Sequence, residues 1–284
     1  MNENSPAEKS DMKAAETQAV GFPSPLLGVE NLRLEVIYNS GGIFALNRPA
    51  NILCGPHPWY DLPVLSEALN EKLKAGKPEL LRLGLDSKKP SEAVFHVDPE
   101  IAGAAVLALG SEAAAKARNA FGSSLWTMTF LLVATGGPES DDARCDLPVA
   151  RHNNLPIALV STKTGRKTET NFRRIERIGK FSVWEATTTY YRAGQVPVHA
   201  VEIGLRILGD TIYAREKPLK LSDIKRKWTG DRDAETPLYD APAVYLAKVR
   251  LENGAEIVAS APKRFKNMLR QLAQIPFGRR CQAE

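Results

Sequence analysis

The sequence predicts an α+β domain with a central, mostly antiparallel, bent sheet, flanking helices and a cleft at its middle. Two observations support this prediction. Runs rich in Thr, Tyr, Phe and Ile, separated by Gly-containing turns, dominate the second half of the chain and are typical of an antiparallel meander. Helical periodicity is limited to a few short segments between such runs. No internal repeat is found.

The first half of the chain begins with residues 1–24, which are rich in Glu, Lys, Ser and Ala and are expected to form a disordered tail. Apolar runs at Leu32–Tyr38 and Ile43–Leu46 predict two strands. Leu65–Lys74 predicts a helix, because its apolar residues recur on one helical face. A second helix is predicted over residues 111–121, since a serine at its start is a suitable N-cap.

The second half is predicted to be mostly strands. Thr168–Ile178 and Phe181–Tyr191 flank a Gly-Lys turn and predict one hairpin. Val244–Leu251 and Glu256–Ser260 flank an Asn-Gly turn and predict another. Residues 137–148 form a polar, acidic stretch that is expected to be a loop between the two halves.

These elements define the predicted domain limits. The folded domain is expected over residues 25–276, closed by an amphipathic helix that starts at Ala261-Pro262, and residues 277–284 are expected to be a basic tail. Residues 1–24 are expected to be too few for a separate folded domain ahead of this one. We therefore expect any target selection to come from the folded domain itself.

Four segments of the chain each match one of the sequence motifs of a single protein family. Phe95–Gly103 places one aspartate, Asp98, on a turn before an apolar run. The other segments are Gly42–Leu53, Met128–Gly136 and 192–213. Together they resemble the H-R-L-D-x-x-T-S-G, v-N-K-P-a-G, K-x-Y-x-A-x-V-x-G and T-G-R-x-H-Q-I-R segments of RluA-type RNA pseudouridine synthases. The resemblance extends over roughly residues 30–275.

The resemblance implies a site and a reaction. Asp98 would be the catalytic carboxylate in the isomerisation of uridine to pseudouridine, with Arg192 paired to it at salt-bridge distance, and no cofactor is expected. Phe130 stands where the family has the tyrosine that stacks on the target base. The RNA-binding candidates that lie in matching segments are His96, Arg48 and Gln195.

The chain departs from the family pattern at several polar positions. The departures are His96 for the family's arginine, Ile101 and Ala102 for its Thr-Ser pair, Met128 for its lysine, and Gly194 and Pro197 for the His and Arg of H-Q-I-R. Two interpretations therefore stay open. The protein is either a divergent, active synthase or an RNA-binding protein that retains Asp98 and Arg192 as a structural ion pair.

Charge supports RNA as the partner. The chain has 284 residues, a net charge of +5 and a pI near 9.0. Basic residues gather in residues 163–180, 225–227 and 263–280, and clusters of this kind suit a polyanion, although each alone is compatible with a solvated surface. The candidates from these clusters are Arg173, Arg174, Lys225, Arg226 and Lys227. Ribosomal or transfer RNA is the expected target class.

Several other classes are not favoured. No apolar stretch is long enough to cross a bilayer and no secretory signal is evident, so a cytoplasmic, monomeric protein without a membrane partner is expected. The three cysteines and four histidines lack metal-ligand spacing, so no metal is expected and the thiols should be reduced. A plain RNA-binding or ribosome-associated protein remains an alternative. A hydrolase that uses Asp98 ranks below it, because no second carboxylate or Ser/His set has suitable spacing.

Overall fold

The computed structural model describes residues 18–225, 229–231 and 234–274 of the chain. The helices are α1 (Leu65–Lys74), α2 (Pro78–Arg82), α3 (Ser111–Gly122), α4 (Gln195–Glu202), α5 (Lys263–Ala273) and the 3-10 helix η1 (Leu221–Asp223). The strands are β1 (Ala19–Phe22), β2 (Leu32–Ser40), β3 (Ile43–Arg48), β4 (Ser91–Ala93), β5 (Ala102–Leu109), β6 (Thr127–Gly136), β7 (Asp142–Cys145), β8 (Val149–Arg151), β9 (Ala158–Val160), β10 (Thr170–Ile178), β11 (Phe181–Thr188), β12 (Leu205–Ile207), β13 (Val244–Arg250) and β14 (Glu256–Val258).

One large sheet organises the described residues, in the order β1-β2-β3-β5-β13-β6-β11-β10-β7, with β12, β14 and β4 added beside it. Strands β8 and β9 form a separate hairpin. Among the described pairs only β5 and β13 are parallel, which confirms the predicted α+β class with a mostly antiparallel sheet.

The parallel pair joins the two halves of the sheet and depends on one glycine. Leu246 of β13 lies opposite Gly103 of β5. Gly103 has a φ of 115°, and a Cβ at this position would lie 2.2 Å from the carbonyl oxygen of Leu246. A side chain at residue 103 would therefore separate the halves at the strand that follows the Asp98 turn.

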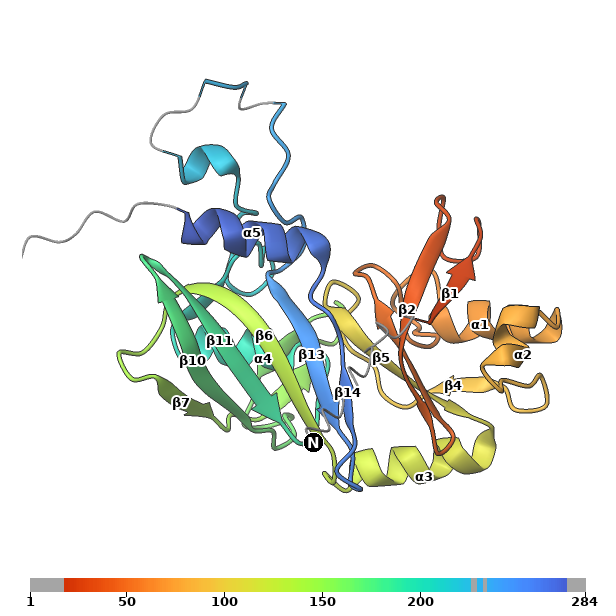
Figure 1. Ribbon diagram of the computed structural model, residues 1–284. Helices are drawn as coiled ribbons and strands as arrows, with labels where there is room; N and C mark the ends of the chain where they lie inside the picture. Colours follow the sequence, from red (N-terminus) through yellow and green to blue (C-terminus); the bar gives the residue numbers. More distant parts are fainter. Residues whose placement is uncertain (1–17, 226–228, 232–233, 275–284) are drawn as a thin grey trace, which may run out of the picture.

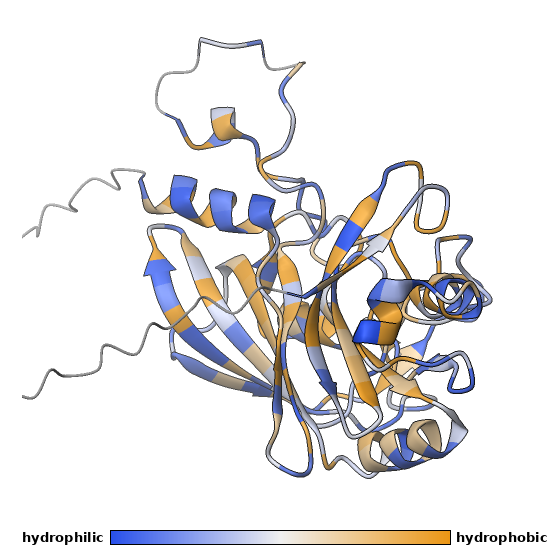
Figure 2. Ribbon diagram, turned by 45° about the vertical axis from the view of Figure 1, so that its right-hand side comes forward, coloured by the Kyte–Doolittle hydropathy of each residue, from blue (hydrophilic) through white to orange (hydrophobic). Residues whose placement is uncertain are grey.

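Strands β3 and β5 separate two apolar cores. Phe44 and Leu107 point into the smaller core, which α1 completes, and Ala45 and Val106 point into the larger one. Burial on both faces explains why β5 is a continuous apolar run. Figure 1 shows α1 and α2 on one side of β5, and α5 with β10 and β11 on the other. Figure 2 shows mainly hydrophobic central strands and a largely hydrophilic α5.

Most predicted elements are present, and helix α1 has the predicted bounds. Three differences stand out. Strand β1 forms inside the predicted tail, where it pairs with β2 and buries Val20 and Phe22, so the tail prediction is wrong for residues 19–22. Strand β7 forms inside the predicted loop 137–148 as an edge partner of β10. Helix α4 was not predicted, because it is buried over most of its surface and has no polar face to create a periodic pattern. The predicted basic tail, 277–284, lies outside the described residues.

Candidate active site

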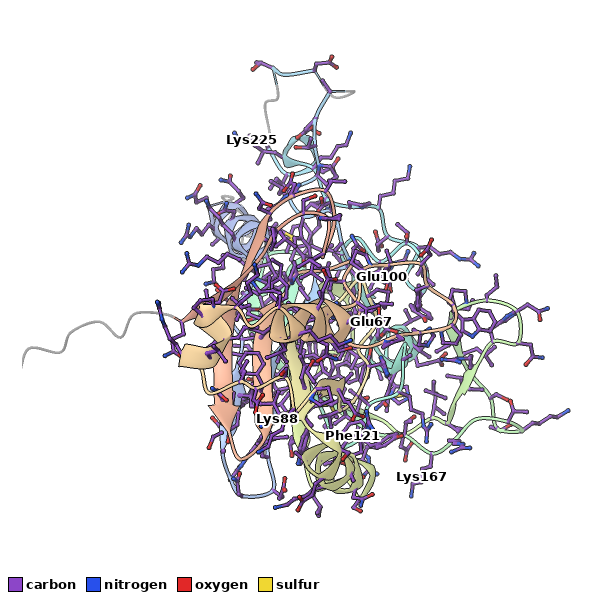
Figure 3. The ribbon with its side chains drawn as sticks, turned by 90° about the vertical axis from the view of Figure 1, so that its right-hand side faces the viewer. Glu67, Lys88, Glu100, Phe121, Lys167 and Lys225 are labelled. Carbon is purple, nitrogen blue, oxygen red and sulfur yellow. The ribbon has the colours of Figure 1, made fainter. Side chains whose placement is uncertain are left out.

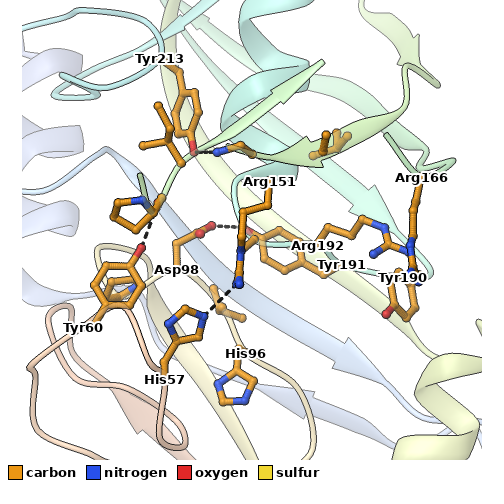
Figure 4. Close-up of a pocket in the computed structure, with 18 of the residues that line it drawn as sticks. His57, Tyr60, His96, Asp98, Arg151, Arg166, Tyr190, Tyr191, Arg192 and Tyr213 are labelled. Carbon is orange, nitrogen blue, oxygen red and sulfur yellow. Dashed lines mark hydrogen bonds between the residues drawn. The ribbon is translucent and has the colours of Figure 1, made fainter. Parts of the chain in front are cut away.

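A pocket of about 330 Å³ lies beside the Asp98 turn and is lined by both halves of the chain. The first half contributes residues from the loop that follows β3 and from the turn between β4 and β5. The second half contributes the β8–β9 hairpin, the segment 190–193 after β11, and Tyr213. Figure 4 shows these side chains converging around Asp98.

Asp98 is held by two donors from the segment after β11. The backbone N–H of Gly194 lies 2.9 Å from each carboxylate oxygen, and the hydroxyl of Tyr191 donates a hydrogen bond to Oδ2. Burial raises the pKa of the Asp98 carboxyl, and the Tyr191 and Gly194 hydrogen bonds oppose that rise. Asp98 is therefore an oriented carboxylate that is more basic than an ordinary aspartate.

The buried side chain of Arg48 holds the backbone of the Asp98 turn in place. This side chain is only 2% exposed, and its guanidinium donates to the carbonyl oxygens of Ile52 and Ile101, with longer contacts to those of Pro99 and Asp98. Arg48 thus ties the loop after β3 to the Asp98 turn through the carbonyl oxygens of Ile52 and Ile101. Contrary to the prediction, Arg48 is not available to contact RNA.

The expected ion pair between Asp98 and Arg192 is not found in the part of the chain that the structure describes. Both residues line the pocket, but the guanidinium carbon of Arg192 lies 5.0 Å from the ring centre of Tyr190. Figure 4 shows Arg192 extending away from Asp98. The hydroxyl of Tyr191 interacts with the carboxylate in place of the predicted arginine.

Phe130 also differs from its predicted role. Its side chain is fully buried and does not line the pocket, so no base can stack on it in this arrangement. The Phe130 ring centre lies 5.0 Å from that of Tyr191. Tyr191 in turn contacts Asp98 through its hydroxyl and so lies between Phe130 and Asp98. Aromatic contact to a ligand in the pocket would come instead from tyrosines that line it, such as Tyr60, Tyr190 and Tyr191.

Gln195 and His199 of α4 are buried and form hydrogen bonds within the fold. The Gln195 amide, fully buried, donates to Thr170 and Thr188 and accepts a hydrogen bond from the backbone N–H of Arg192. The predicted contact of Gln195 with RNA is therefore wrong. His199 is fully buried and bonds to the hydroxyl of Thr170 and to a backbone carbonyl, which confirms the expectation of a histidine satisfied within the fold.

The predicted basic candidates on β10 lie outside the pocket lining. Arg173 is exposed and pairs with Glu185 at 2.5 Å. Arg174 pairs with Asp141 at 2.6 Å and also donates to two nearby carbonyl oxygens. Both arginines are already neutralised by carboxylates in this structure.

The predicted basic cluster at residues 225–227 is only partly covered by the described residues. Lys225 is exposed after η1, whereas Arg226 and Lys227 lie outside the described residues. Figure 3 shows Lys225 on a projecting loop, well separated from Glu100 beside the Asp98 turn. A role for this cluster in RNA binding stays a prediction.

The pocket contains basic and aromatic residues that had no assigned role. Arg151 of β8 lies 3.0 Å from His57 Nε2, and its guanidinium carbon is 5.9 Å from the ring centre of Trp59. The hydroxyl of Tyr60 donates to the carbonyl oxygen of Pro156 at 3.2 Å. These contacts join the loop after β3 to the β8–β9 hairpin. The one available sequence signal was the loop itself, which carries a histidine and two aromatic residues among prolines.

His57 and His96 also line this part of the pocket. Burial, followed by the charge of Arg151, lowers the pKa of His57, so neutral His57 accepts a hydrogen bond from Arg151 near neutral pH. His96 lines the pocket as an exposed residue, with its ring centre 6.1 Å from that of His57. The predicted RNA contact of His96 is compatible with this position.

The described ranges hold no group of three or more His, Cys, Asp or Glu side chains able to bind a metal ion. None of the helices in those ranges is long and apolar enough to cross a membrane.

Comparisons with known proteins agree with the fold. Human RNA pseudouridylate synthase domain containing 4 superimposes with a TM-score of 0.61 at 14% identity, over 84% of this chain and 92% of that one. Human RNA pseudouridylate synthase domain containing 1 gives a TM-score of 0.51 at 15% identity, over 81% and 83% of the two chains. The fold is therefore that of the pseudouridylate synthases.

Sequence comparisons point in the same direction, although no family model matches the chain. An uncharacterised RNA pseudouridine synthase of Synechocystis is 26% identical over 71% of this chain and 62% of its own length. A ribosomal large subunit pseudouridine synthase D of Zymomonas mobilis is 27% identical over 66% and 58%. The chain spans about three fifths of these curated relatives. Its resemblance to the RluA-type RNA pseudouridine synthases is confirmed.

Proposed function

We propose that this protein converts uridine to pseudouridine in a structured RNA, either ribosomal or transfer RNA, with Asp98 as the catalytic carboxylate. The observation that carries the proposal is the setting of Asp98. It is a partly buried carboxylate, oriented by Tyr191 and Gly194, in a pocket of a pseudouridylate synthase fold.

The reaction places simple demands on this site. The bond between the sugar and N1 of uracil breaks, the base turns, and the sugar carbon bonds to C5; C5 then loses its proton, and N1 gains one. No oxidant or cofactor is required for this balance. Asp98 can act as a nucleophile toward the substrate or as the acceptor of a proton, and its raised pKa favours proton transfer more than an ordinary aspartate would.

Access to Asp98 requires a base that has left its stack. The pocket, at about 330 Å³, offers the aromatic rings of Tyr60, Tyr190 and Tyr191 as walls for such a base. Arg151 and Arg166 supply positive charge at the same pocket for the RNA backbone. This arrangement supports a single extruded nucleotide as the substrate unit.

Pseudouridine mapping in cellular RNA, with and without this protein, tests the proposal. We expect at least one uridine to be modified only when the wild-type protein is present. A strain that carries Asp98→Asn should lack the same modification, because this substitution preserves shape and removes the charge. RNA binding of the variant should be retained, since phosphate contacts supply most of the affinity.

A second candidate function is RNA binding without catalysis. The missing ion pair between Asp98 and Arg192 favours this alternative, because it removes the charge partner that the family resemblance implied. Equal pseudouridine maps with and without the protein, together with equal RNA affinity of wild type and Asp98→Asn, would establish it. Absence of RNA binding would contradict both candidates.

A further inference from the structure

Arg192 stands at the end of a stack of aromatic rings that leads into the pocket. Phe95 stacks on Phe121 of α3 at 5.0 Å, and Phe121 stacks on Tyr190 at 4.7 Å. The Arg192 guanidinium carbon then lies 5.0 Å from the Tyr190 ring centre. This stack fixes the position of the guanidinium through packing and cation–π attraction, without any carboxylate.

The bonding of Arg192 is incomplete in this position. Its Nε is buried and has no hydrogen-bond partner, and no ion pair involves its guanidinium within the described ranges. An exposed arginine can donate its hydrogen bonds to water, but a donor excluded from solvent costs free energy as long as it has no acceptor. Among the described residues no side chain forms an ion pair with this guanidinium, so its terminal nitrogens can donate to a ligand oxygen in the pocket.

Arg166 brings a second guanidinium to the same pocket. It extends from the loop ahead of β10 and, like Arg192, has no carboxylate within ion-pair distance among the described residues. Figure 4 shows Arg166, Arg192 and Tyr190 on one side of the pocket, opposite Tyr60. Outside the pocket, Arg144 of β7 and Arg173 and Arg174 of β10 are paired with carboxylates. Arg166 and Arg192 thus both reach the pocket without a carboxylate partner among the described residues.

The acidic group of the pocket cannot serve both arginines. Asp98 is the one carboxylate among the described residues that lines the pocket, and its oxygens already accept hydrogen bonds from Tyr191 and Gly194. Two cations beside one engaged carboxylate leave this side of the pocket positively charged. A planar guanidinium matches the paired oxygens of a phosphate group, which makes such a group the fitting ligand.

We propose that Arg166 and Arg192 form a subsite for one backbone phosphate next to the uridine that reaches Asp98. The ring of Tyr190 packs against the Arg192 guanidinium and holds it in place. This inference rests on the proposed function, because it takes the occupant of the pocket to be a nucleotide within RNA. It assigns Arg192 to substrate binding and assigns the orientation of Asp98 to Tyr191 and Gly194.

A thermodynamic cycle on the full-length protein tests the subsite. The probes are the trinucleotide UpUpU and two analogues, each with one phosphate replaced by a neutral methylphosphonate, on the 5′ or the 3′ side of the middle uridine. For wild type we expect one of the two analogues to bind about tenfold more weakly than UpUpU. In Arg192→Gln and Arg166→Gln the same replacement should cost less than about twofold, since the charge partner is gone.

Arg173→Gln is the matched control, because Arg173 is paired with Glu185 away from the pocket. In this variant the methylphosphonate penalty should equal that of wild type. Equal penalties in wild type and in both pocket variants would overturn the subsite, as would failure of wild type to bind UpUpU. Pseudouridine mapping in cells tests only the proposed chemistry. If the mapping found no modified uridine but the arginine substitutions abolished the methylphosphonate penalty, the phosphate subsite would still be supported.

Discussion

The hydroxyl of Tyr191 donates a hydrogen bond to the carboxylate of Asp98, although 93 positions separate the two residues in the sequence. The ring of Tyr191 packs on Phe130, and burial, followed by the charge of Asp98, raises the pKa of the phenol. Tyr191 therefore stays protonated and remains a donor at ordinary pH. A neutral donor holds Asp98 where the family resemblance implied a charged one.

Replacement of this donor should slow the reaction. Tyr191→Phe keeps the ring on Phe130 but removes a hydrogen bond to a charged group, which contributes about 1.5–3 kcal/mol, or roughly tenfold to a hundredfold in rate. Because this bond lowers the pKa of Asp98, the acidic limb of the pH–rate profile should also move to higher pH. Single-turnover rates across pH measure both effects. Tyr245→Phe, at a tyrosine packed on α5, controls for loss of a phenol, and an unchanged profile would contradict the assignment.

Asp98→Asn should also change stability in a pH-dependent manner. The pKa of Asp98 is raised on folding, so its contribution to stability is fully present below the unfolded pKa of about 3.9 and is lost as pH rises through the folded value. An asparagine does not titrate, and the free energy of unfolding of the variant relative to wild type should therefore rise from pH 4 to pH 8. Urea unfolding at several pH values measures this difference. A relative stability that falls with pH would refute the prediction.

Gly194→Ala should damage both fold and site. Gly194 has a φ of 75°, and a Cβ there would lie 2.5 Å from the hydroxyl oxygen of Tyr213 and 2.6 Å from Ala158 Cβ. Relief of these contacts must displace the N–H that holds Asp98. We expect loss of about 1–3 kcal/mol in unfolding free energy and a reduced rate at saturating RNA. Gly41→Ala, at a turn glycine with open space around it, controls for backbone strain alone. Wild-type kinetics in Gly194→Ala would contradict this view of the site.

Arg48 should prove essential for stability and not for direct RNA contact. Arg48→Met removes the donor to the carbonyl oxygens of Ile52 and Ile101, and we expect a loss of at least about 3 kcal/mol by denaturant unfolding. Arg48→Lys should rescue only partly, because one ammonium group cannot reproduce the planar fork. If Arg48→Met unfolds at the wild-type midpoint yet binds RNA more weakly, the RNA-binding prediction from the sequence was right after all.

The local elements of this fold could be predicted, because their signals are local. Leu65–Lys74 has one apolar helical face, and the hairpin that β10 and β11 form has a Gly-Lys turn between β-branched and aromatic runs. Strand β1 and helix α4 escaped prediction because each obtains its stability from partners distant in sequence. Short strands and fully buried helices carry little periodic pattern of their own.

The sequence by itself determined the fold class, the position of Asp98 on a turn before a buried strand, and the resemblance to RluA-type pseudouridine synthases. Only the tertiary structure decided which side chains meet there. Arg48 and Gln195 proved to be buried, and Tyr191, not Arg192, holds the carboxylate. The physical reason is that a side chain's partner depends on burial and on which rotamer the surrounding packing leaves open. Both are properties of contacts between residues far apart in the chain.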